Sequence, residues 1–267
     1  MFGGDGATPS PNTGYFGGGL PTVSTMDKVT YSTDTTAEVP GAALSAARYY
    51  IAATGNSTDG YFGGGNTPGG AFSTMDKITY STDTTAAVPG AAFSTVRYRF
   101  AATGNSTAGY FGGGLDGTGQ LSTMDKVTYS TDTTTAAPGA NLTVARRGPT
   151  ATGNSTAGYF GGGFTPGPNF YSTMDKVTYS SDTTAAVPGA ALSIARFDLA
   201  ATGNSEAGYF GGGGPAYSTM DKVTYSTDTT AAVPGAALSV ARYNLAASSA
   251  RANGLPTTGP TLAPVII

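Results

Sequence analysis

Short runs of alternating apolar and polar residues, separated by turn residues, cover most of the chain and predict strands rather than helices. The run 123–129 places Val127 and Tyr129 on one face of a strand, with Met124 and Lys126 on the other. Three other short runs bounded by turn residues lie near it in the sequence: 97–102, 108–111 and 134–137. Apolar residues on both faces favour a sheet that is packed between two neighbouring sheets.

The same pattern returns five times along the chain. The string Gly-Tyr-Phe-Gly-Gly-Gly begins at five positions: Gly14, Gly60, Gly109, Gly158 and Gly208. A period of roughly 49 residues with four strands in each unit is typical of a β-propeller blade. The sequence therefore predicts an all-β fold, a five-bladed β-propeller of four-stranded antiparallel blades.

Each unit also carries a more specific likeness, described here for one of them. Arg97 opens the inner strand, Tyr110–Gly113 is an aromatic strand that ends in glycines, and Tyr129 closes a strand before a turn that contains Asp132. In these features the unit resembles the kelch repeat, which implies a propeller. Ala136 stands where that family has a tryptophan, and five blades are fewer than its usual six or seven. The likeness thus implies a fold and little about biological role.

The ends of the repeat region predict how the ring closes. Residues 1–13 form an N-terminal segment, 14–250 hold the five repeats, and 251–267 form an extended proline-rich arm. The last inner strand, 242–247, is expected to complete the blade whose other strands come from 14–46. The ring would then be closed by pairing of its N- and C-terminal segments, which hides the strand edges. An open stack of repeats is the alternative.

Composition removes several classes of function. Charged residues make up 11% of the chain and the net charge is −3, so no basic surface for nucleic acid is expected. No apolar run approaches the length of a membrane-spanning helix. Cysteine and histidine are both absent, which removes disulfides, zinc and iron–sulfur sites, thiol nucleophiles and imidazole bases. We expect a protein without cofactors or enzymatic activity, made in a cytoplasm because the N-terminus has no secretory signal.

Two charged motifs recur in every repeat. The pair Asp125-Lys126 has a copy in each unit and is expected to form pairs between blades or on the surface. The arginine series is expected to bond carbonyls or carboxylates between blades, with the lining of an anion-attracting channel as the alternative: Arg48, Arg97, Arg146, Arg196 and Arg242. A catalytic centre rarely appears five times, so structural roles are favoured for both motifs.

The five copies differ from one another in two regions. One is the loop after the triple glycine, and the other is the segment that follows the repeated arginine. Because successive strands run in opposite directions, both regions should lie on the same face, around the mouth of the channel. Loops on a rigid scaffold often carry binding residues, although drift of surface loops would leave the same pattern. The candidate binding residues on this face are Phe72, Arg99, Phe164, Phe170, Tyr171 and Tyr217.

The C-terminal arm ends in an apolar sequence that suggests assembly. Leu262, Val265, Ile266 and Ile267 could dock on another protein subunit, or the arm could fold back on its own propeller or stay disordered.

The style of the repeats is similar to the Gly-Tyr-Phe-Gly-Gly-Gly repeat proteins of phage virions, notably phages of cyanobacteria. That resemblance implies a structural virion protein, such as a fibre, tail or capsid-decorating adhesin, located in a virion or outside the cell. The alternative is a secreted or cell-surface propeller that binds carbohydrate, with a host-surface glycan stacked on the aromatic loops.

Overall fold

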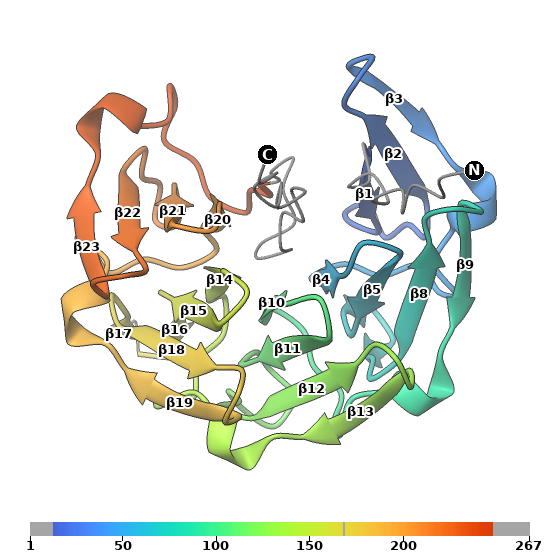
Figure 1. The fold of residues 1–267 in the computed structure, drawn as a ribbon, viewed down its shortest axis with the longest axis horizontal. Helices are drawn as coiled ribbons and strands as arrows, with labels where there is room; N and C mark the ends of the chain where they lie inside the picture. Colours follow the sequence, from blue (N-terminus) through green and yellow to red (C-terminus); the bar gives the residue numbers. More distant parts are fainter. Residues whose placement is uncertain (1–12, 168, 248–267) are drawn as a thin grey trace, which may run out of the picture.

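The computed structural model describes residues 13–167 and 169–247, which fold into strands and single-turn 3₁₀ helices. Five antiparallel sheets stand side by side around a central axis, and their innermost strands face that axis (Figure 1). The chain therefore forms the five-bladed β-propeller that its repeats predict. No helix within the described ranges is long and apolar enough to cross a membrane.

The first sheet has three strands in the described part of the chain: β1 (Thr13–Gly17), β2 (Met26–Thr30) and β3 (Thr35–Glu38). The second sheet contains β4 (Ala52–Gly55), β5 (Asp59–Gly63), β8 (Met75–Thr79) and β9 (Thr84–Ala87). The third contains β10 (Ala101–Gly104), β11 (Ala108–Gly112), β12 (Met124–Thr128) and β13 (Thr133–Ala136). The fourth contains β14 (Thr150–Gly153), β15 (Ala157–Gly161), β18 (Met174–Thr178) and β19 (Thr183–Ala186). The fifth contains β20 (Ala200–Gly203), β21 (Ala207–Gly211), β22 (Met220–Thr224) and β23 (Thr229–Ala232).

Two short hairpins and five 3₁₀ helices lie outside these five sheets in the described part of the chain. Two hairpins form in loops after triple glycines: β6 (Asn66–Thr67) with β7 (Gly70–Ala71), and β16 (Phe164–Thr165) with β17 (Asn169–Phe170). A 3₁₀ helix with proline at its first position follows each outer strand: η1 (Pro40–Ala42), η2 (Pro89–Ala91), η3 (Pro138–Ala140), η4 (Pro188–Ala190) and η5 (Pro234–Ala236).

The inner strands begin later than the sequence predicts. The expected strand 97–102 is replaced by β10, which starts at Ala101 and continues through Thr103 and Gly104 into the predicted turn. The reason is local: Arg99 has a φ of 54°, a left-handed conformation that a strand cannot contain. The segment between the repeated arginine and the strand is therefore a bend rather than part of the sheet.

The segment that leads from the outer strand of one sheet to the inner strand of the next is held by a buried ion pair. We call this segment a connection, and we call each place where it is tied to the sheet that it enters a joint. Arg97 Nη2 lies 2.9 Å from Asp125 Oδ2, and neither side chain is exposed to solvent. The Ser94 backbone N–H donates to the same carboxylate at 3.2 Å. Burial lowers the pKa of Arg97, while the negative charge of Asp125 opposes that shift. The same pair recurs at three other joints: Arg48 with Asp76, Arg146 with Asp175, and Arg196 with Asp221. The arginines thus bond carboxylates as expected, but within the blade that each connection enters rather than between blades.

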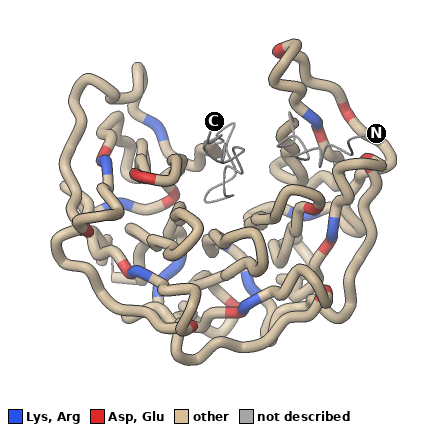
Figure 2. The backbone as a smooth tube through the Cα atoms, in the orientation of Figure 1, with Lys and Arg blue, Asp and Glu red and all other residues tan. Residues whose placement is uncertain are grey.

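A second set of contacts joins each sheet to the next at the opposite end of the strands. Lys126 Nζ lies 2.8 Å from Asp182 Oδ2 in the following sheet, and the Tyr110 hydroxyl donates to the same carboxylate. Tyr110 also stacks on Tyr179, with ring centroids 4.8 Å apart. Basic and acidic residues accordingly recur in neighbouring positions around the arc (Figure 2). The adjacent residues Asp125 and Lys126 thus have different partners: Asp125 binds Arg97 of the connection, and Lys126 binds Asp182 of the following sheet.

The predicted closure of the ring is not found among the described residues. The segment 242–247 joins no sheet, and Arg242 is exposed and forms a bridge with Tyr217 of its own blade. Phe16 on the first sheet is 44% exposed, whereas its equivalents Phe111 and Phe160 are fully buried. The physical reason is that Arg242 is exposed, so the buried arginine–aspartate pair that ties the other four connections to their sheets does not hold 242–247 against the first sheet. The first and last sheets lie at separate ends of an arc (Figure 1).

We predict that Arg97→Met lowers the free energy of unfolding by about 3–5 kcal/mol, because it leaves the buried Asp125 without its counter-charge. Arg242→Met, at the equivalent position of the last repeat, should have little effect because Arg242 is exposed. Urea unfolding of both variants tests this. Equal losses would mean that the fifth joint also forms and that the ring is closed in solution.

Candidate functional site

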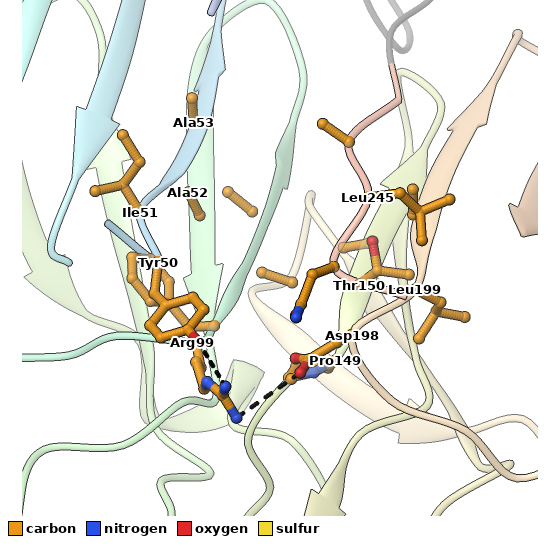
Figure 3. Close-up of a pocket in the computed structure, with 18 of the residues that line it drawn as sticks. Tyr50, Ile51, Ala52, Ala53, Arg99, Pro149, Thr150, Asp198, Leu199 and Leu245 are labelled. Atoms are coloured by element: carbon orange, nitrogen blue, oxygen red, sulfur yellow. Dashed lines mark hydrogen bonds and ion pairs between the residues drawn. The ribbon is translucent and has the colours of Figure 1, made fainter. Parts of the chain in front are cut away.

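A cavity of ≈ 620 Å³ lies on the propeller axis (Figure 3). Its walls come from the inner strands, which line it with small side chains: Ala53, Ala102, Ala151 and Ala201. Larger apolar residues, Ile51, Phe100, Pro149, Leu199 and Leu245, line it at the position just after the bend. The side chains along its walls are therefore mainly apolar, and the charged groups of its lining come from the residues at the bend itself.

Five residues at equivalent positions, two after the repeated arginine, form what we call the rim ring: Tyr50, Arg99, Gly148, Asp198 and Asn244. All five have positive φ angles, between 49° and 64°. Backbone hydrogen bonds link them in order around the axis. The N–H of Arg99 donates to Tyr50 O at 3.2 Å, and that of Gly148 donates to Arg99 O at 2.7 Å. The N–H groups of Asp198 and Asn244 continue the series, each at 2.9 Å from the carbonyl before it. The ring therefore has one backbone shape and five different side chains.

Arg99 connects two other members of the rim ring (Figure 3). Its Nη2 donates to the Tyr50 hydroxyl at 2.7 Å, and its guanidinium carbon lies 4.3 Å from the centroid of the Tyr50 ring. Its Nη1 lies 3.7 Å from Asp198 Oδ2, which is an ion-pair distance but too long for a hydrogen bond. A guanidinium, a carboxylate and a phenol thus meet at the mouth of an apolar cavity.

The absence of a side chain at position 148 makes this meeting possible. A Cβ atom added to Gly148 would lie 2.5 Å from Asp198 Oδ1. Burial raises the pKa of Asp198, although the positive charges of Arg99 and Arg147 partly oppose the shift. Asp198 is the only carboxylate among the residues that line the cavity, and no cluster of three potential metal ligands forms within the described ranges.

An aromatic cluster lies beside this mouth, on the hairpin β16–β17. Phe164 and Phe170 face each other across the hairpin, and both contact Phe197, at centroid distances of 4.4 and 5.0 Å. The Arg147 guanidinium lies 4.3 Å from the centroid of the Phe164 ring. Phe170 remains 36% exposed, so the cluster offers one aromatic face to solvent.

The two variable regions meet, as their strand directions predict. β-bridges join the loop after the triple glycine to the segment that follows the repeated arginine, for example Tyr98 with Leu115 and Arg147 with Phe164. We call the side of the propeller formed by these two regions the variable face. Of the six candidate residues, the structure brings Phe164 and Phe170 together and places Arg99 in the rim ring.

The other three candidates hold loops in place. The backbone carbonyls of Phe72, Tyr171 and Tyr217 each accept the N–H of the repeated arginine that follows, at 3.0–3.2 Å. Phe72 also packs under the guanidinium of Arg48, at 5.8 Å. Their side chains lie on separate blades, and the Tyr171 hydroxyl lies 3.2 Å from Thr165 Oγ1 on the hairpin that carries the aromatic cluster.

Four rim-ring residues and Phe197 were not singled out from the sequence. A signal was present, since position two after each repeated arginine holds a different residue in every copy. What the sequence lacked was the left-handed bend that turns these positions toward the axis. The arm residues Leu262, Val265, Ile266 and Ile267 lie outside the described part of the chain.

No protein-family profile and no curated protein matches the sequence. Among solved structures, the chain is similar to one described as "Structure of YjhT", with a TM-score of 0.72 and 11% sequence identity. The similarity covers 88% of this chain and 84% of that one. At this identity the likeness supports the propeller fold alone.

Because burial raises the pKa of Asp198, its charged form is less favourable in the folded protein than in the unfolded chain. The contribution of Asp198 to stability should therefore be greatest below the ordinary aspartate pKa and fall as the pH rises through its raised value. We predict that wild type loses stability relative to Asp198→Asn as the pH rises from acid to neutral, measured by urea unfolding. The opposite slope would mean that Arg99 and Arg147 outweigh burial.

Proposed function

We propose that this chain is a non-enzymatic structural or adhesive protein. In this proposal it belongs to a larger assembly of the kind found in phage virions and presents the variable face for binding. The observation that carries the proposal is the division of the molecule. At one end of the blades the same Tyr–Lys–Asp contacts recur between each sheet and the next, four times among the described residues, whereas the other end differs from blade to blade.

This division separates a constant scaffold from a surface that can vary without loss of the fold. The constant end holds the same acceptor in successive sheets: Asp83, Asp132, Asp182 and Asp228. The variable face carries loops of different length and the rim ring of five different residues. Variation on a rigid scaffold is the usual design of recognition proteins. The repeat style noted above supports a virion component in particular.

The composition of the cavity supports a role without catalysis. Among the described residues its lining offers one carboxylate, Asp198, while glycoside hydrolysis by the usual route needs two. The sequence contains no histidine or cysteine that could act as base or nucleophile. Arg99 and Tyr50 are already engaged with each other at 2.7 Å.

Assembly through the C-terminal arm gives a direct test. We expect deletion of residues 251–267 to abolish oligomers seen by light scattering and electron microscopy, while circular dichroism and the unfolding midpoint stay unchanged. Deletion of residues 1–10 is the matched control and should leave assembly intact. A full-length chain that stays monomeric at all concentrations would count against self-assembly.

The aromatic cluster favours a second candidate function, carbohydrate binding. Phe170 is partly exposed and is held by Phe164 and Phe197, and the guanidinium of Arg147 lies over the ring of Phe164. Aromatic faces next to hydrogen-bonding groups suit the C–H face of a sugar ring. This role is compatible with an adhesive protein and specifies what it adheres to.

If the cluster is a sugar platform, Phe170→Ala should remove the signal of the protein on a glycan array. Tyr243→Ala is the matched control, because Tyr243 is another exposed aromatic residue, on the last blade. A glycan signal that survives Phe170→Ala would separate sugar binding from this cluster.

A further inference from the structure

We propose that the rim ring is a binding site for one neutral, hydroxyl-rich ring, the terminal residue of a saccharide, at the mouth of the axial cavity. This inference rests on the proposed binding function and assigns it to residues other than the exposed aromatic cluster. Three observations carry it: the diversity of the ring, the mixture of its polar groups and the room between them.

The first observation is a contrast between two sets of left-handed residues. One set, in the turns before the outer strands, is aspartate in all five blades: Asp34, Asp83, Asp132, Asp182 and Asp228. The rim ring has the same kind of backbone but carries tyrosine, arginine, glycine, aspartate and asparagine. A left-handed conformation costs a non-glycine residue on the order of 1 kcal/mol, so a purely structural bend would favour glycine or asparagine throughout. The varied side chains therefore indicate selection for what they present to the axis.

The second observation concerns charge and hydrogen bonding. Among the described residues that line the cavity, Arg99 and Asp198 are the two charged side chains and have opposite signs, while the nearby Arg147 guanidinium is stacked on Phe164. An anionic ligand would meet the carboxylate and a cationic one the guanidinium. The ring offers donors from Arg99, acceptors from Asp198, and both from Tyr50 and Asn244. A hydroxyl group donates and accepts at once, so neighbouring hydroxyls on one ring match this mixture. A neutral sugar fits these groups better than an acidic or basic ligand does.

The third observation is the incomplete contact between the two charges. Arg99 Nη1 and Asp198 Oδ2 are 3.7 Å apart, and no direct hydrogen bond joins them. Gly148 lies between these residues in the ring order and contributes no side chain. Hydroxyls of a bound ring can therefore reach both groups from the cavity side. The cavity, at ≈ 620 Å³, falls in the range of small-molecule sites, and Leu199 and Ile51 provide apolar contact below the rim.

The test uses the full-length chain and methyl glycosides of glucose, galactose, mannose and N-acetylglucosamine, followed by ligand-observed NMR. Glucuronic acid and glucosamine serve as acidic and basic probes of the same size. We expect at least one neutral glycoside to bind, and the two charged probes to bind more weakly. Asp198→Asn and Arg99→Gln should each weaken binding by about tenfold or more, the effect of losing one hydrogen bond to a charged group.

Asp182→Asn is the matched control, since Asp182 is also a left-handed aspartate but lies at the constant end of the blades. It should leave binding unchanged, and unfolding curves check that all three variants are folded. Absence of binding by every neutral glycoside would overturn the inference. So would binding that Asp198→Asn and Arg99→Gln leave intact.

The glycan array described under the proposed function, carried out also with Asp198→Asn, distinguishes this inference from that function. If glycan binding depends on Phe170 and not on Asp198, the protein is a carbohydrate-binding propeller and the rim-ring assignment is wrong. If the arm deletion abolishes assembly while no sugar binds, the structural role stands and the saccharide site does not.

Discussion

A guanidinium and a carboxylate, both sealed from water, hold each connection of this protein against the sheet that it enters. Removing two charges from water is costly, and the pair is tolerable only when the groups meet with good geometry. Here the Nε atom of each buried arginine and one oxygen of three of the aspartates have no partner within the described structure. The pairs therefore act mainly as a constraint: any other packing of the connection would leave a charge alone in the core.

This constraint also shapes the candidate site. Arg97 is anchored by Asp125, and two residues later the chain must turn toward the axis to begin β10. Arg99 makes that turn in a left-handed conformation. The same anchor and turn in other blades produce a ring of residues whose backbone positions are fixed and whose side chains are free to differ. The repeated buried ion pairs thus fix the backbone of the rim ring and leave its side chains free to vary.

The two ends of the arc follow from the same repetition. Asp27 on the first sheet and Arg242 after the last stand at the positions that pair in the other four joints, and Arg242 is exposed. Phe16 is exposed for the same reason, because no preceding blade covers it. Each joint stabilises its neighbours only pairwise, so the end blades have fewer contacts than the central ones.

The sequence by itself determined the number of blades, the four-strand pattern, the bonding of the repeated arginines to carboxylates and the face on which variation gathers. These features repeat, and local periodicity together with strand direction is enough to derive them. The sequence could not determine that Phe164, Phe170 and Phe197 form one cluster, because they lie on a hairpin and on the next connection. Nor could it determine that Tyr50, Arg99 and Asp198 meet, or that 242–247 stays apart from the first sheet. Those outcomes depend on the rotation between sheets and on a left-handed bend, which only the packing of whole blades sets.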